Sequence, residues 1–145
     1  MASTLTEVQD EIIEEFEMFT DWMDRYNYLI ELSKDLPVID AKYKTNDNLI
    51  NGCQSKVWLM AEMEGENLVF KADSDAIITK GIIALLIRVM SNRKPSELMN
   101  ADLYFIEVIG LRQNLSPTRS NGLLSMIKQM KYYALAYHTK INSKQ

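Results

Sequence analysis

The sequence predicts a mixed fold in which several helices pack against one small antiparallel sheet. Apolar residues recur at helical spacing in the first and last thirds of the chain. Between these regions, residues 56–63 are strand-like, with Val57, Leu59, Ala61 and Met63 on one face, and a second strand-like run follows at residues 68–72. The two runs are separated by Glu64-Gly65-Glu66-Asn67, which is typical of a tight turn. The centre of the chain is therefore expected to form a hairpin.

The length and composition indicate one globular domain. A chain of 145 residues is long enough to bury a core without cross-links, so we expect a single domain over residues 1–145. Hydrophobic residues make up 47% of the chain and charged residues 25%, which argues against disorder. The polar residues from about Asn142 onward are expected to form a frayed tail.

The net charge of -4, without any basic run, argues against nucleic acid and anionic membranes as partners, and an acidic surface suits docking on another protein. The first ten residues lack the basic and apolar blocks of a signal peptide, and the longest apolar run, residues 82–87, is too short to span a bilayer. A single cysteine allows no internal disulfide and no Cys/His metal cluster, so we expect a cytoplasmic protein without a cofactor of its own.

Two helices are expected to open the chain. Thr4 and Thr6 both stand at capping-box spacing before a stripe formed by Val8, Ile12, Phe16 and Phe19. A second start signal at Thr20-Asp21 precedes an apolar stripe that includes Trp22, Tyr26 and Leu29 and ends before Pro37. We interpret these aromatic residues as core rather than as a ligand site.

The polar stretch from Val38 to Asn51 is predicted to be a surface loop that leads to the hairpin, with a possible third short strand near Leu49-Ile50. After the hairpin, Asp73-Ser74-Asp75 offers N-cap candidates for a central buried helix from about Ala76 to Met90. Gly81 weakens that helix intrinsically, which suggests that another element crosses close by.

Short helical pieces are expected near Pro95 and over residues 103–111. Ser116-Pro117 then supplies a cap and a favourable first residue for the last helix. Its apolar stripe runs from Leu123 through Ile127, Met130 and Ala134 to Tyr137.

The only cysteine, Cys53, is the candidate functional residue. It is flanked by Asn51, Gly52, Gln54 and Ser55, which form turns and hydrogen bonds rather than a packed core. Gly52 also leaves room for a partner to approach the sulfur. Two interpretations stay open from the spacing alone: a reactive, reachable thiol, or an inert buried one.

The chemistry open to Cys53 is narrow. A thiol hydrolase needs a base beside the nucleophile, and the only histidine, His138, stands near the end of the last helix. A dithiol oxidoreductase needs a second cysteine, which is absent from the chain. What remains is attack on sulfur delivered by another protein, which yields a persulfide as the cargo.

At this point the residues resemble a known family. Asn51-Gly52-Cys53-Gln54-Ser55-Lys56-Val57-Trp58 is similar to the Gly-Cys-Gln-Ser-x-Val-Trp signature of the SufE family of sulfur acceptors, which includes the CsdE relatives. Three further stretches agree in order: Trp22 through Tyr26 to Leu32, Asp73-Ser74-Asp75-Ala76 with Lys80-Gly81, and Leu115 to Leu123. Together these stretches cover most of the chain.

The resemblance implies an α+β domain like the IscU-type scaffold, without the metal-ligand cysteines of that scaffold. It implies that Cys53 accepts persulfide sulfur from a cysteine desulfurase of the SufS or CsdA kind, which carries pyridoxal phosphate. The acceptor would stimulate that desulfurase and pass sulfur to an iron–sulfur assembly scaffold. On this interpretation the protein is a sulfur acceptor and activator more than a stand-alone enzyme.

The resemblance also points to residues around the cysteine. Asp75 and Arg119 match family positions near the cysteine loop, where they would control loop position and partner docking. The plainer alternatives are helix capping for Asp75, which we favour, and a solvated charge for Arg119. Gln54 and Ser55 either stabilise the turn or bond the sulfur. The alternative function is a regulator that docks through its surface and leaves Cys53 unused chemically.

Overall fold

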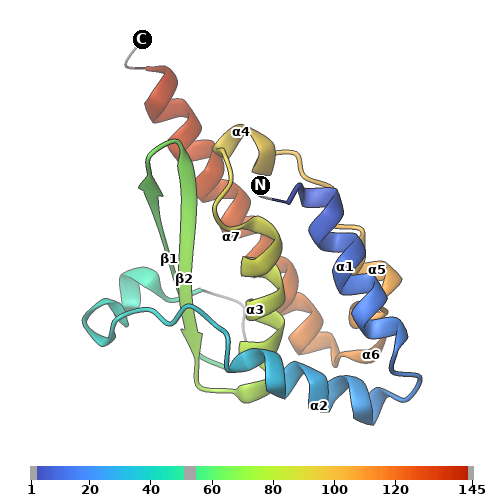
Figure 1. Ribbon diagram of the computed structural model, residues 1–145. Coiled ribbons are helices and arrows are strands. Elements are labelled where there is room, and N and C mark those ends of the chain that lie inside the picture. Colours follow the sequence, from blue (N-terminus) through green and yellow to red (C-terminus); the bar gives the residue numbers. More distant parts are fainter. Residues whose placement is uncertain (1–2, 51–54, 144–145) are drawn as a thin grey trace.

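The computed structural model describes residues 3–50 and 55–143 and has an α+β architecture (Figure 1). This confirms the predicted fold class. The helices are α1 (Leu5–Glu17), α2 (Trp22–Ser33), α3 (Ile77–Met90), α4 (Pro95–Leu98), α5 (Phe105–Val108), α6 (Leu111–Asn114) and α7 (Pro117–Asn142). The strands are β1 (Val57–Glu64) and β2 (Asn67–Ser74), and two short 3-10 turns, η1 (Ala41–Tyr43) and η2 (Asn46–Asn48), precede them.

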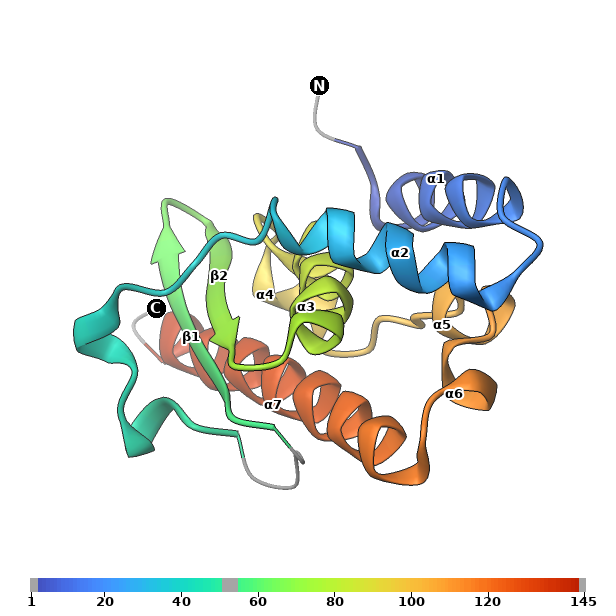
Figure 2. The same ribbon diagram turned by 90° about the horizontal axis from the view of Figure 1, so that it is seen from below.

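Helix α3 forms the centre of the fold. It lies between the hairpin, helices α1 and α2, and the long helix α7 (Figures 1 and 2). Its buried residues reach around most of the helix, from Gly81 to Met90. A Cβ atom on Gly81 would lie 2.2 Å from the backbone oxygen of Leu29 in α2. The predicted close crossing at Gly81 is therefore confirmed, and α2 is the element that crosses.

The hairpin is antiparallel, and its register runs from Val57 opposite Ser74 to Glu64 opposite Asn67. The alternating residues Val57, Leu59 and Ala61 are buried, as are Leu68, Phe70 and Ala72. Gly65 takes a positive φ of 63° in the connecting turn, a conformation that glycine adopts without steric penalty. The possible third strand is reduced to one antiparallel bridge between Leu49 and Trp58.

Local capping signals set the starts of three helices. The side chain of Thr4 accepts a hydrogen bond from the Glu7 backbone N–H, which selects Thr4 over Thr6 as the α1 cap. Asp21 and Ser116 cap α2 and α7 in the same way. These capping predictions are confirmed, and each satisfies a backbone donor that has no partner within the helix.

The predicted caps of α3 are wrong. The N-cap position of α3 is Ala76, which has no side-chain capping bond. The Ser74 hydroxyl accepts from the Ala76 backbone N–H at 3.2 Å, one step before the helix begins. The carboxylates of Asp73 and Asp75 bind groups at the base of the hairpin instead.

The polar stretch before the hairpin forms an excursion from the domain, and we call residues 40–48 the arm. Its residues 40–47 are all exposed, whereas Ile39 and Ile50 on either side are buried. The arm projects beyond β1 in two views, with η1 and η2 at its outer end (Figures 1 and 2). The surface loop predicted for residues 38–51 is confirmed over residues 40–47, whereas Ile39 and Ile50 belong to the buried interior and Asn51 lies outside the described residues.

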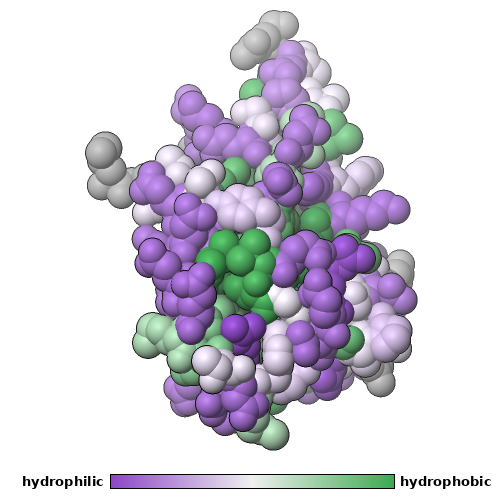
Figure 3. All heavy atoms as spheres, turned by 90° about the vertical axis from the view of Figure 1, so that its right-hand side faces the viewer, coloured by the Kyte–Doolittle hydropathy of each residue, from purple (hydrophilic) through white to green (hydrophobic). Residues whose placement is uncertain are grey.

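The opposite side of the molecule is formed by α1 and the α5–α6 segment. Its surface is mainly hydrophilic, and a compact group of hydrophobic atoms lies near its centre (Figure 3). Val108, the last residue of α5, is one of the exposed large hydrophobic residues of the protein. Within residues 3–50 and 55–143, no helix has the length and apolar content needed to cross a membrane.

Candidate functional site

The predicted site residues Gly52, Cys53 and Gln54 lie outside the described residues, so the site is built from the residues on either side. Upstream, the Ile50 backbone N–H donates to the Val57 carbonyl at 2.8 Å. Downstream, the Lys56 backbone N–H donates to Asp75 Oδ1 at 3.0 Å, and the Asp75 N–H donates to the Lys56 carbonyl at 3.3 Å. Both sides of the segment that contains Cys53 are therefore attached to the base of the hairpin.

The capping role favoured for Asp75 is wrong. Its carboxylate does not bond to the first turn of α3 but holds the backbone of Lys56, 19 positions earlier in the chain. This pair of bonds extends the hairpin ladder beyond Val57 and Ser74. Asp75 is thus bonded to the chain just after Ser55, and its role in loop position and partner docking stays a prediction.

A small pocket lies beside Ser55. Among the described residues, its polar lining consists of Ser55, Thr79, Thr118 and Arg119. Its apolar lining consists of Ile82, Leu123 and Met126, with Gly122 beside them. The structure therefore brings two of the predicted site residues, Ser55 and Arg119, to one pocket, while Asp75 contacts the adjacent residue Lys56.

The pocket is an electropositive environment. Thr79 is the third residue of α3, and Thr118 and Arg119 are the second and third residues of α7, so both helices begin at the pocket. A helix N-terminus carries a partial positive charge that favours anions. Arg119 is exposed and adds a full charge, and no acidic side chain among the described residues pairs with it. This combination favours an anionic ligand or thiolate.

A charged cluster lies at the base of the same hairpin. Asp73 is 5% exposed, and its carboxylate is bound by Lys44 from the arm and by Lys80 from α3, the latter at 3.2 Å. The Ser74 backbone N–H donates to the same carboxylate at 2.8 Å. Burial alone raises the pKa of Asp73, but the hydrogen bonds from Lys44, Ser74 and Lys80 outweigh that effect and hold the pKa below its usual value.

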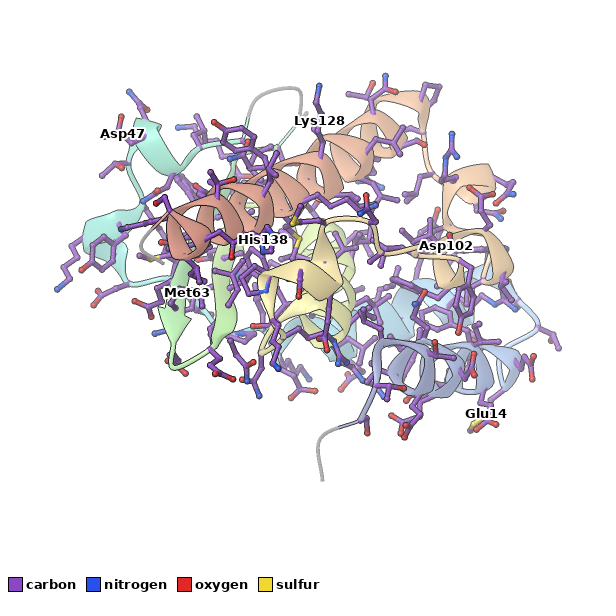
Figure 4. All side chains as sticks on the ribbon, turned by 90° about the horizontal axis from the view of Figure 1, so that it is seen from above. Glu14, Asp47, Met63, Asp102, Lys128 and His138 are labelled. Atoms are coloured by element: carbon purple, nitrogen blue, oxygen red, sulfur yellow. The ribbon has the colours of Figure 1, made fainter. Side chains whose placement is uncertain are left out.

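His138 lies at the other end of the hairpin. It lines a pocket with Gly65 and Glu66 of the connecting turn, and Figure 4 shows it in the later part of α7. Ser55 precedes the opposite end of β1, and an eight-residue strand is roughly 25 Å long. The hydrolase interpretation required a histidine beside Cys53, and the placement of His138 relative to Ser55 gives that interpretation no support.

In the part of the chain that the structure describes, no group of three or more His, Cys, Asp or Glu side chains could hold a metal ion. The side chains at the pocket and in the charged cluster to which the sequence analysis assigned no role are Thr79, Thr118, Lys44 and Lys80. The two threonines lie in the first turns of α3 and α7, which local sequence signals can predict, but their meeting at one pocket depends on the fold. Nothing in the spacing of Lys44 pointed to Asp73, because only the folded arm brings these residues together.

The comparisons with known proteins agree with this arrangement. The family model named SufE, described as an Fe-S metabolism associated domain, matches residues 10–134. An uncharacterized SufE-like protein of Rhizobium etli is 42% identical over 127 residues, which cover 84% of this chain and 86% of that protein. An uncharacterized SufE-like protein of Synechocystis is 35% identical over 126 residues, which cover 87% and 79%.

SufE-like protein 1 of Arabidopsis thaliana, described as chloroplastic/mitochondrial, is 39% identical over 131 residues, or 90% of this chain. The match spans only 35% of the length of that plant protein. A solution structure of a hypothetical protein from Thermus thermophilus has a TM-score of 0.75 at 18% identity, covering 91% of this chain and 96% of that one. That likeness concerns the fold alone. The family model and the relatives together show that the chain belongs to the SufE family, whose domain is associated with Fe–S metabolism.

Proposed function

We propose that this protein is a sulfur acceptor that takes persulfide sulfur onto Cys53 from a cysteine desulfurase and passes it to iron–sulfur cluster assembly. The observation that carries the proposal is the pocket beside Ser55, where two helix N-termini and Arg119 meet. It supports the proposal because the reacting species, a thiolate and then a persulfide anion, are both negatively charged. Family membership supports the same role.

The transfer step requires only a thiolate. The Cys53 thiolate attacks the outer sulfur of the persulfide on the desulfurase, so one S–S bond forms and another breaks. The desulfurase cysteine leaves as a thiolate, and no external oxidant or reductant is consumed. This exchange needs neither an adjacent histidine nor a second cysteine, which fits a chain that contains one cysteine and one histidine.

The partner supplies the cofactor in this scheme. A SufS-like or CsdA-like desulfurase carries the pyridoxal phosphate that releases sulfur from cysteine, and removal of its persulfide by Cys53 stimulates its turnover. An iron–sulfur scaffold protein is the recipient. The cytoplasmic location stays a prediction that rests on the presence of a single cysteine in the sequence.

The decisive experiment is mass spectrometry after incubation with a cysteine desulfurase and cysteine. We expect the mass of one additional sulfur atom on Cys53, removable by a reducing thiol. Cys53→Ser should carry no added sulfur and should not stimulate the desulfurase. If Cys53→Ser stimulates the desulfurase as fully as the wild type, the protein is a surface-docking regulator and the acceptor role is wrong.

A further inference from the structure

The arm is connected to the rest of the domain mainly at its two ends. At one end the Ile39 N–H donates to the Ala72 carbonyl at 3.1 Å, and at the other Leu49 forms a bridge with Trp58. Between these points, among the described residues, the polar contacts from the arm to the rest of the domain come from Lys44. Its ammonium group pairs with Asp73 and lies 5.5 Å from the centre of the Trp58 ring.

Lys44 is not the only cation on Asp73. The carboxylate side chain is 8% exposed and also binds Lys80 of α3 at 3.2 Å, while the two lysine side chains are 31% and 34% exposed. A buried carboxylate that loses its only cation is strongly destabilising, because the charge is then uncompensated. With Lys80 and the Ser74 N–H in place, Asp73 stays compensated when Lys44 leaves.

We propose that Lys44, Asp73 and Lys80 form a releasable latch that sets the position of the arm. Lys44 closes the latch by holding the arm on the sheet, and Lys80 makes opening easy by neutralising Asp73 when Lys44 departs. One anion shared by two cations, each from a different element, is the arrangement that allows release without a buried unpaired charge. Lys44 and Lys80 therefore have opposite effects on the arm although they bind the same carboxylate.

The latch bears on sulfur transfer because the arm leads directly to the segment that contains Cys53. This link rests on the proposed function, whereas the motion of the arm does not. Lys44 and Lys80 are positioning residues on this account, because they act through the arm and contact no reacting atom.

The experiment measures backbone hydrogen exchange in peptides that cover residues 40–50. Lys44→Met should speed exchange about tenfold, because the closed state loses its tie. Lys80→Met should slow exchange by about threefold, because opening would now leave the Asp73 carboxylate unpaired. Lys44→Arg should leave the exchange rate at its wild-type value, because arginine keeps the positive charge that pairs with Asp73.

Lys42→Met is the matched control, because Lys42 lies two residues away in the arm, its ammonium group lies over the Tyr43 ring, and it forms no ion pair among residues 3–50 and 55–143. Exchange in α7 should not change in any of these variants. If Lys80→Met speeds exchange as Lys44→Met does, both residues merely stabilise the fold and the latch is wrong. If Lys80→Met does not fold, Asp73→Asn must speed exchange as Lys44→Met does, and unchanged exchange overturns the proposal.

Alkylation of Cys53 by iodoacetamide tests the connection to sulfur transfer. We expect the alkylation rate of Cys53 to rise in Lys44→Met and to fall in Lys80→Met. Equal alkylation rates in the two variants would show that the position of the arm does not affect Cys53. Absence of added sulfur on Cys53 after incubation with a desulfurase would instead refute the proposed function, and the exchange results would still decide the latch.

Discussion

At the scale of single residues, Asp73 couples the charge state of one carboxyl to the stability of the hairpin base. Its pKa is lowered in the folded protein, because Lys44, the Ser74 N–H and Lys80 together outweigh its burial. A carboxyl with a lowered pKa stabilises the fold above its unfolded pKa of about 3.9. That stability is lost as the pH falls through the folded pKa.

Replacing Asp73 by Asn should therefore have a pH-dependent effect. We expect Asp73→Asn to lower the free energy of unfolding by about 1–3 kcal/mol at pH 7, with a smaller difference below about pH 4. Urea unfolding of both proteins between pH 7 and pH 3 measures this change. Glu62→Gln is the control, because the Glu62–Lys71 pair spans 3.7 Å with both side chains about half exposed and should contribute little. A difference that is the same at all pH values would show that Asp73 is not held as a carboxylate.

Asp75 shows why the contacts of a single residue were hard to predict from the sequence. Its position before a helix favoured a capping role, because capping depends on neighbours within a few residues. The hairpin register instead placed it beside Lys56, and that long-range partner determined its contact. Cys53 was singled out as the only cysteine, by its turn-forming neighbours and by the family resemblance, and its chemistry stays a prediction.

At the scale of secondary-structure elements, the crossing of α2 over α3 depends on Gly81. Its missing side chain lets the Leu29 carbonyl approach to a point 2.2 Å from where a Cβ would stand, and the clashing atom belongs to the backbone. Gly81→Ala should therefore destabilise the protein by about 3 kcal/mol or more, because neither helix can shift without disturbing the core.

Gly65→Ala is the comparison variant for that measurement. A Cβ at Gly65 has no atom within 4 Å, and only its positive φ of 63° opposes a side chain, so we expect a loss of about 1 kcal/mol. Urea unfolding with both variants separates the close approach from backbone conformation. An equal loss in the two would mean that α2 and α3 separate readily at this crossing.

Elements were predictable where the signal was local. The caps at Thr4, Asp21 and Ser116, the hairpin turn at Gly65 and the stripe of α7 all follow from spacings of a few residues. The third strand was predicted less well, because a single bridge between Leu49 and Trp58 depends on how the arm returns to the sheet. The pocket beside Ser55 joins segments more than 60 positions apart in the chain, so no local pattern could indicate it.

At the scale of the whole molecule, acidic and basic side chains are concentrated in different elements. Residues 4–35 carry ten acidic and two basic side chains, whereas α7 carries four basic side chains and no acidic one. Glu14 on α1 and Lys128 on α7 lie on opposite sides of the molecule (Figure 4). The pocket beside Ser55 lies at the start of α7, so a partner that docks there approaches the basic side of a protein whose net charge is -4.

This division predicts how association with a desulfurase depends on salt. A partner that reaches the pocket productively should present acidic groups to it, and attraction between opposite charges speeds encounter at low ionic strength. The association rate measured by stopped flow should therefore fall as salt is raised from about 0.05 to 0.5 M. Lys128→Glu should slow association, whereas Glu14→Lys, on the far side, should change it little. A rate that rises with salt would show that the net charge of the chain, rather than its basic side, governs docking.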